Sequence, residues 1–164
     1  MHIRREQPED HLLIHQLTAE AFAPMTFSDG TEPDIIDKLR AAGNLSISLV
    51  ALKNYVLVGH VAFSPVSIGD VADSWYGLGP VSVQPGLQRT GIGSALINDG
   101  LRKLENMGAA GCALIGDPNY YCRFGFVSDG SIHYEGLPDK HVQWKSFGKQ
   151  HPEGFLVFSP EFDD

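Results

Sequence analysis

Several features that would define other protein classes are missing from this sequence. Only two of its 164 residues are cysteines, Cys112 and Cys122, and they form no CxxC pair and no metal-ligand spacing. This excludes a disulfide framework and predicts two buried thiols in a reducing cytoplasm. The seven histidines lack an HExxH or similar pattern, so no metal is expected. No apolar run approaches the ~20 residues of a membrane helix, and residues 1–8 contain no apolar segment of a signal peptide, so we expect neither membrane association nor export.

Positive charge is also scarce. The chain has 12 Lys and Arg against 20 Asp and Glu, a net charge of −8, and its basic residues form no cluster. These features argue against nucleic acid as a partner. The negative charge keeps such a protein in solution, and it would also favour cationic partners such as amines. The length and the 43% hydrophobic content are those of one globular domain covering residues 1–164.

The most informative segment that is present lies between a strand and a helix. Residues 78–83 predict a buried strand that Pro85 closes, and Gln88–Gly93 follow it. Apolar residues then recur with the period of an amphipathic helix, at Ile92, Leu96, Ile97, Leu101 and Leu104. Glycines at a helix start let a ligand approach the first N–H groups, which together with the helix dipole favour phosphate oxygens. The segment therefore indicates a pyrophosphate site, although a turn without ligand is the alternative.

Two common nucleotide motifs do not fit this segment. A Walker A loop requires a lysine at the helix start, and none is there. A dinucleotide fingerprint requires a third glycine, but Gly91 and Gly93 are followed by Ala95 and Leu96. Gln88–Gly93 instead resembles the Q/R-x-x-G-x-G/A motif with which the GNAT superfamily of N-acetyltransferases binds the pyrophosphate of acetyl-coenzyme A.

A second segment strengthens this resemblance. Asp117–Phe126 is similar to the later aromatic-Tyr-x-x-x-Gly-Phe pattern of the same family, and the two segments begin 29 residues apart. The Gly-Asp-Pro-x-Tyr-Tyr run that begins at Gly116 resembles a bacterial subgroup of predicted acetyltransferases. Gly116–Asn119 replaces the Asn-x-x-Ala segment of many members, and Pro118 predicts a shortened helix there.

The resemblance implies a fold, a cofactor and site residues. The fold is a single-domain α/β GNAT fold, a mixed central sheet splayed between strands 4 and 5 and flanked by helices. Acetyl-CoA is the implied co-substrate, with its pantetheine arm along Val81, Ser82 and Val83. The residues implied to hold the pyrophosphate are Gln88, Arg89, Thr90, Gly91, Ile92, Gly93 and Ser94.

The family also implies catalytic roles. A main-chain N–H of Val83 would stabilise the oxyanion, and Tyr121 would be the general acid that protonates the leaving thiolate. Tyr120 is left as a packing or cofactor-lining residue, and Asn119 beside it is assigned to the cofactor site. The family does not fix the general base. Candidates are Asp34, Asp73 and Glu32, of which Glu32 is favoured because the loop and helix around it usually cover the acceptor site.

The remaining sequence predicts an alternation of strands and helices. His60 falls inside a strand and is interpreted as a core histidine rather than a base. The acidic residues near 32–37 are typical of a solvated first helical turn, and residues 131–151 give no clear pattern. The predicted helices are at 11–22 and 33–42. The predicted strands are at 3–5, 46–51, 56–63, 112–116 and 154–158, and the strand at 56–63 continues to 68.

Together these features predict a cytoplasmic acyltransferase, monomer or homodimer, that acetylates a primary amine of a small molecule or protein. The alternative is a non-catalytic acyl-CoA-binding sensor or interaction module on the same fold. The acceptor is not readable from the sequence, because one fold and one cofactor site serve many substrates.

Overall fold

The computed structural model describes residues 1–70 and 74–163. Within these residues no helix is long and apolar enough to cross a membrane. Contacts divide the chain into two compact units, residues 1–63 with 79–100, and residues 64–78 with 101–163. Three elements run from one unit into the other: β3 (Val56–Ile68), β4 (Trp75–Val83) and α3 (Ile92–Asn106). Neither unit is therefore a continuous piece of sequence.

The first unit is built on an antiparallel arrangement of β1 (His2–Arg5), β2 (Ile47–Lys53) and the first part of β3. Arg4 pairs with Val50, and Val50 pairs with His60. The connection from β2 to β3 contains Asn54 and Tyr55, whose φ angles are 52° and 67°. Two positive φ values are what a tight hairpin turn requires, so β2 and β3, which are antiparallel, form a hairpin that turns at these two residues.

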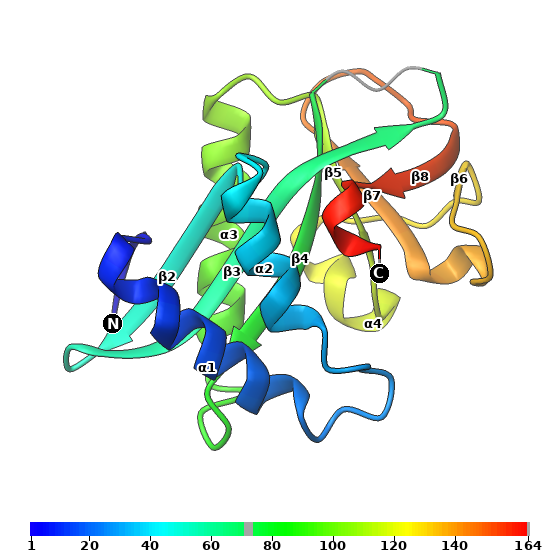
Figure 1. The fold of residues 1–164 in the computed structure, drawn as a ribbon. Coiled ribbons are helices and arrows are strands. Elements are labelled where there is room, and N and C mark those ends of the chain that lie inside the picture. The colour runs from blue at the N-terminus through cyan, green and yellow to red at the C-terminus, as the bar shows by residue number, and fades with distance from the viewer. Residues whose placement is uncertain (71–73, 164) are drawn as a thin grey trace. The chain divides into compact units, whose positions relative to one another are not determined.

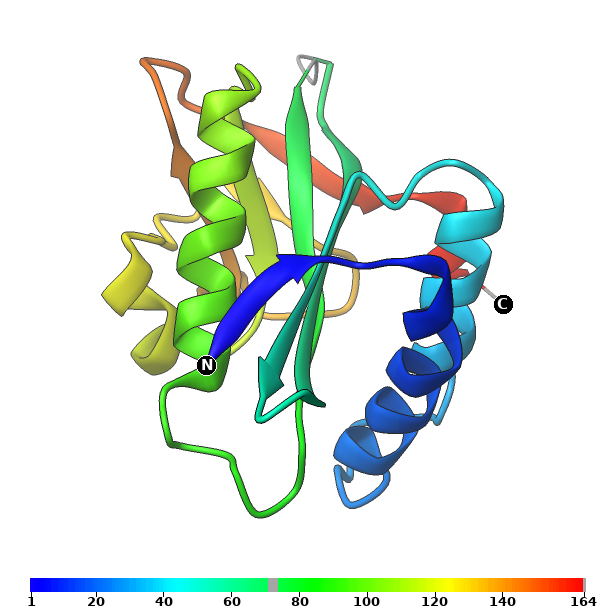
Figure 2. The same cartoon turned by 90° about the vertical axis from the view of Figure 1, so that its left-hand side faces the viewer.

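Helices cover both faces of these strands (Figures 1 and 2). α1 (His11–Phe22) and α2 (Glu32–Ala41) lie side by side on one face, where Ile14, Ile36 and Val50 form a buried apolar cluster. The first half of α3 covers the other face. A Cβ on Gly59 of β3 would lie 2.7 Å from Ile92 Cγ2, so the glycine is what lets the start of α3 approach the sheet.

The second unit contains both parallel and antiparallel pairs. The start of β4 is parallel to β5 (Gly111–Ile115), β7 (Val142–Ser146) is antiparallel to β5, and β8 (Gly154–Phe158) pairs with the end of β3 and with β6 (Ile132–His133). The β4–β5 register covers Trp75–Gly77 with Gly111–Ala113, as expected of two strands that splay further along. The core residues are Val66, Ile68, Trp75, Ala113, Ile132, Val142 and Leu156.

Most predicted elements occur at the predicted places. The helix at 11–22 and the strand at 154–158 match α1 and β8, and Pro118 begins the short helix α4 (Pro118–Tyr121). The prediction of two buried thiols is wrong for one of them. Cys112 is buried in β5, but Cys122 is exposed because it begins a one-turn 3₁₀ helix at the surface.

Candidate functional site

The loop after β4 is held by its own hydrogen bonds. The N–H of Gln84 donates to Val58 O (2.8 Å), which ties the end of β4 to β3. The side-chain Nε2 of Gln88 donates to Val83 O (3.3 Å), and Thr90 Oγ1 donates to Leu87 O (2.5 Å). These bonds fold the loop back toward the end of the strand and set the direction in which α3 begins.

The start of α3 has the geometry of an anion site. Gly91 has φ +96°, and a Cβ built on it would meet nothing within 4 Å, so the space beside it is open. Its carbonyl accepts the N–H of Ala95 (3.0 Å). The N–H groups of the first turn have no acceptor within a helix, and they lie at its positive end. Ile92 is 5% exposed, so its side chain packs inward and only its backbone is available to a ligand.

Tyr121 occupies a half-buried position made possible by a glycine. A Cβ on Gly116 would lie 2.5 Å from Tyr121 Cε2, so only glycine leaves room for the ring beside the end of β5. The ring also contacts Phe124 and Phe126, each with ring centres 6.2 Å apart. Burial, followed by the charges of Tyr120 and Cys112, raises the pKa of Tyr121 to about 12. The phenol is therefore protonated at neutral pH, as a general acid must be.

Tyr120 is held differently from Tyr121. The Arg123 guanidinium lies 4.3 Å from the centre of the Tyr120 ring, and Arg123 Nε donates to Tyr120 O (2.8 Å). The two tyrosine rings are perpendicular, at 89°. Asp117 caps α4 by accepting the N–H of Asn119 (2.9 Å). The adjacent tyrosines thus face different surroundings, Tyr121 beside Gly116 and Phe126 and Tyr120 beside Arg123.

Glu32 lies at a pocket in the first unit. It is the first residue of α2, and Ser28 Oγ donates a short hydrogen bond to its Oε1. The pocket measures about 200 Å³, and its lining is formed by Ala19, Phe22, Ala23, Ser28, Gly30, Glu32 and Pro33. Asp34 is exposed on α2, and Asp73 lies outside the described residues.

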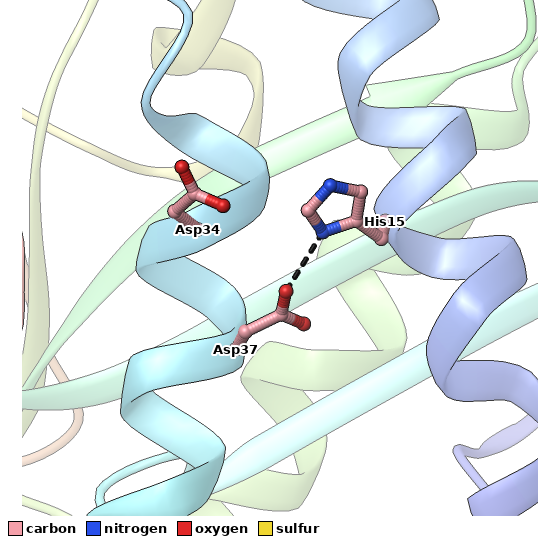
Figure 3. Close-up of side chains that lie close together, drawn as sticks. All are labelled: His15, Asp34 and Asp37. Carbon is pink, nitrogen blue, oxygen red and sulfur yellow. Dashed lines mark hydrogen bonds and ion pairs between the residues drawn. The ribbon is translucent and has the colours of Figure 1, made fainter.

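Figure 3 shows a second group of polar side chains, His15 on α1 with Asp34 and Asp37 on α2. Their ligand-type atoms all lie within 4.8 Å of one another. His15 Nδ1 is 2.7 Å from Asp37 Oδ2, and Arg40 Nη1 donates to Asp37 Oδ1 (3.1 Å). Because Asp37 already pairs with two basic groups, this cluster links α1 to α2 through polar contacts. Of the acidic residues predicted as a solvated helical turn, Asp37 therefore takes part in a tertiary contact with α1.

His60 is a core histidine, as predicted, but only one of its two ring nitrogens has a hydrogen-bond partner among the described residues. It is 0% exposed, and its Nε2 lies 2.8 Å from Ser48 Oγ. Its Nδ1 has no hydrogen-bond partner within residues 1–70 and 74–163, and the same holds for the buried Oγ of Ser82 on β4. The side chain of Ser82 is therefore turned inward, and among Val81–Val83 only the flanking valines are half-exposed.

The first unit brings together most of the predicted site residues. Val81–Val83, Gln88–Ser94 and Glu32 belong to it, while Asn119–Tyr121 belong to the second unit. Sequence reasoning missed Gly116 and Ser28, which position Tyr121 and Glu32. The glycine before Asp117 was visible in the sequence, but its steric purpose depends on a ring five residues later. No sequence signal pointed to Ser28.

Comparison with known proteins gives one consistent family. A model of the acetyltransferase (GNAT) family matches residues 13–126. The uncharacterized N-acetyltransferase YhbS of Escherichia coli K12 is 33% identical over 108 residues, 65% of this chain and 65% of that protein. The match thus spans slightly less than two thirds of that relative. Uncharacterized N-acetyltransferase YjhQ of the same organism is 31% identical over 104 residues, 61% of this chain and 58% of that protein.

Two solved structures cover nearly the whole chain. One is a GNAT family acetyltransferase from Brucella melitensis in complex with acetyl-CoA, with 45% identity and a TM-score of 0.88 over 99% of this chain and 97% of that one. The other is YhbS from Escherichia coli in complex with CoA, with 26% identity and a TM-score of 0.89 over 99% of this chain and 92% of that one. The mixed α/β fold expected from the sequence is confirmed by these neighbours.

Proposed function

The chain belongs to the GNAT acetyltransferase family, and from this premise we propose that it transfers the acetyl group of acetyl-CoA to a primary amine by direct attack in a ternary complex. One observation carries the proposal. The open, exposed loop Gln88–Gly91 leads into the first turn of α3, whose backbone N–H groups have no acceptor within the helix and suit an anion, in a chain 45% identical to a family member crystallised with acetyl-CoA.

The cofactor would bind mainly through the backbone. The N–H groups of Gly91, Ile92, Gly93 and Ser94 would donate to the pyrophosphate, with the exposed side chains of Gln88, Arg89 and Thr90 around it. Val81–Val83 would pair with the pantetheine arm as an added strand. Asn119 and Tyr120 would line the arm further along. Local N–H donors are needed here because the net charge of −8 repels an anionic cofactor.

The reaction needs three groups besides the reactants. Glu32 takes a proton from the ammonium, and the neutral amine attacks the thioester carbonyl carbon. The N–H of Val83 stabilises the oxyanion as the C–N bond forms. The C–S bond then breaks, and the Tyr121 hydroxyl gives its proton to the leaving thiolate. The nitrogen of the new amide gives its remaining extra proton through solvent to the Tyr121 phenolate, and Glu32 releases its proton to solvent. Within the described residues the Tyr121 hydroxyl has no hydrogen-bond partner that would compete for the proton.

We further propose that residues 1–164 act as one domain in the cytoplasm, as a monomer or homodimer. The chain passes between the two units at residues 63–64, 78–79 and 100–101, so neither unit could be cut out as an independent domain. Both cysteines are free thiols, as is usual in a reducing compartment.

The test measures binding and turnover separately. Calorimetry with acetyl-CoA should show binding, and a panel of primary amines should include one that releases free thiol only when amine, acetyl-CoA and protein are all present. Acetyl-CoA binding without thiol release from any amine would favour the acyl-CoA sensor instead. Absence of acetyl-CoA binding would overturn the proposal.

A further inference from the structure

The pocket beside Glu32 has a composition that selects among amines. Four of its seven lining residues present apolar groups, namely Ala19, Phe22, Ala23 and Pro33. Glu32 is the single charged residue of this lining, and no lysine or arginine belongs to it. A pocket of this kind suits a ligand with one cationic group and an apolar body.

Glu32 is arranged to meet such a cation. Ser28 Oγ donates to Oε1 of Glu32, which fixes the carboxylate and leaves Oε2 for another donor. The residue that follows, Pro33, is buried and holds the first turn of α2 in place. The charged residues adjacent in sequence to the lining, Glu20, Asp29 and Asp34, are all acidic. The surroundings therefore add attraction for a cation and repulsion for an anion.

The size of the pocket limits the ligand. Its 200 Å³ is below the roughly 300–1,000 Å³ of pockets for drug-sized ligands. At about 30 Å³ for a water-sized group, it holds on the order of half a dozen non-hydrogen atoms. This volume therefore favours a short alkyl or small aryl-alkyl chain over an aminosugar ring system.

The pocket also lies toward the proposed cofactor loop. In both views of the fold, the chain between α1 and α2 and the loop that precedes α3 lie at the same end of the first unit (Figures 1 and 2). An amine held at Glu32 is therefore at the end of the unit where Val83 and Gln88–Ser94 also lie.

We propose that the acceptor is a small primary monoamine with a short apolar body and no carboxylate, whose body fills the pocket between α1 and α2 and whose ammonium group binds Glu32. This inference rests on the proposed function and adds to it the chemical class of the acceptor. Like-charge repulsion at Glu32 and its acidic neighbours excludes amino acids and acidic peptides. The limited volume excludes large polyamines with bulky rings.

The experiment compares acceptors that differ in one property. Pentylamine, aminohexanoate, a lysine-containing peptide and an aminoglycoside are tested by thiol release at saturating acetyl-CoA. We expect kcat/KM for pentylamine to exceed that for aminohexanoate, which has a similar chain and an added carboxylate, by roughly tenfold or more. Equal values for these two, or a higher value for the peptide or the aminoglycoside, would overturn the proposal.

A pair of variants on α1 tests the location. Ala19→Leu places a larger side chain in the pocket and should raise KM for pentylamine by about tenfold, because the added side chain occupies the space of the amine's apolar body. KM for acetyl-CoA should stay unchanged. Gln16→Leu makes a similar change at an exposed position of the same helix outside the lining and is the matched control. An unchanged KM for pentylamine in Ala19→Leu would remove the pocket from the acceptor site.

A binding measurement separates this inference from the proposed function. Pentylamine titrated into the isotope-labelled protein should shift the amide resonances of Ala19, Ser28 and Gly30, with no such shifts for aminohexanoate. If no amine yields free thiol but these shifts occur, the proposed reaction fails and the amine pocket stands. If thiol is released without these shifts, the acceptor binds elsewhere and the pocket assignment is wrong.

Discussion

Ser48 Oγ lies 2.8 Å from His60 Nε2, in contact with a histidine that is completely buried. Ser48 also donates its hydroxyl proton in a very short hydrogen bond to Glu6 Oε1. With that proton engaged, the serine oxygen accepts from His60, which places the imidazole proton on Nε2. The lone pair of Nδ1 therefore stays inside the protein without a described partner. One hydroxyl group thus decides the tautomer of a core histidine.

Glu6 also links Ser48 to α1 and α2, the helices that cover this face of the sheet. Arg40 on α2 donates to both carboxylate oxygens of Glu6, at 2.7 and 3.0 Å, and His11 Nε2 is 3.1 Å from Glu6 Oε2. Burial raises the pKa of Glu6, but hydrogen bonds from Arg40 and Ser48 outweigh it, so the pKa is lowered overall. An ionised, fully bonded Glu6 connects β2 and β3 to α1 and α2.

The first prediction concerns stability against pH. Burial is the main reason why the pKa of His60 is lowered from 6.5 to about 4. The unfolded chain therefore binds a proton at His60 as the pH falls below 6.5. The folded chain binds it only near pH 4, so the free energy of unfolding decreases as the pH falls between these two values. Between pH 7 and 5 the loss is about 2 kcal/mol. Denaturant titrations at both pH values should show it in the wild type.

His60→Gln removes the titrating group and keeps an amide that can donate to Ser48. Its unfolding free energy should be lower overall but should change less between pH 7 and 5. Glu6 does not interfere, because a carboxyl with a lowered pKa loses its contribution only below its usual value near 4.5. An equal pH dependence in wild type and variant would show that His60 does not cause it.

The second prediction compares two buried serines. Ser48→Ala removes the group that joins Glu6 to His60 and leaves His60 Nε2 without a described partner, while Glu6 Oε1 keeps its bond from Arg40. This should cost about 1–3 kcal/mol of unfolding free energy. Ser64, which is 0% exposed and has no described hydrogen-bond partner, is the control. Ser64→Ala should cost less than ~0.5 kcal/mol or should stabilise, because it removes an unsatisfied hydroxyl. Similar losses in both variants would mean that packing, not the hydrogen-bond chain, is measured.

The third prediction concerns the proposed pyrophosphate site. Gly93→Val places a branched side chain at the second residue of α3, in the space where the pyrophosphate would approach the backbone. Binding of acetyl-CoA should be lost while the thermal unfolding temperature of the ligand-free protein changes little. In the parent protein acetyl-CoA should raise that temperature, because a ligand that binds only the native state stabilises it.

Asn98→Val is the matched control for this helix. Asn98 is exposed on α3 beyond the first turn. The substitution therefore also introduces a β-branched residue into the helix, but it leaves the loop unchanged. Asn98→Val should bind acetyl-CoA like the parent. Parental affinity in a folded Gly93→Val protein would place the pyrophosphate elsewhere.

Local patterns sufficed where a segment itself carries a clear apolar period or apolar run. The period of α1 and the apolar run of β8 gave their bounds, and the glycines before α3 indicated an anion site. Residues 131–151 gave no pattern because their strands are short and their partners are distant. β6 has two residues and pairs with β8, and β7 pairs with β5. Such pairings depend on the whole fold and leave little trace in a short segment.

The site shows the same division between local and distant information. Tyr121 was assigned by its spacing to Gly125 and Phe126, which is a local feature. What holds its surroundings is not local, since Gln143 Nε2 donates to Gly116 O (3.0 Å) from a strand 27 residues further along the chain. The pocket at Glu32 likewise needs Ala19 and Phe22 from another helix. Sequence spacing identified the candidate site residues, but only the tertiary structure brings together the residues that position them.

The last prediction concerns the two tyrosines. Tyr121→Phe keeps the ring beside Gly116 and removes only the hydroxyl, so stability and acetyl-CoA affinity should barely change. If the phenol protonates the leaving thiolate, kcat should fall by about 10²–10⁴. Since burial raises the pKa of Tyr121 to about 12, the parent enzyme should keep its acid form up to about that pH. Its kcat should not decline through loss of this proton near pH 10, where an ordinary tyrosine titrates.

Tyr120→Phe is the matched control, because it removes a hydroxyl from the adjacent ring and leaves the stacking of Arg123 on that ring in place. Its kcat should stay within a few-fold of the parent value, since only the ring takes part in this contact. A large loss in Tyr120→Phe with an active Tyr121→Phe would shift the acid by one residue. If both variants stay fully active, the thiolate is protonated by solvent, and Tyr121 contributes only its packing against Gly116 and Phe126.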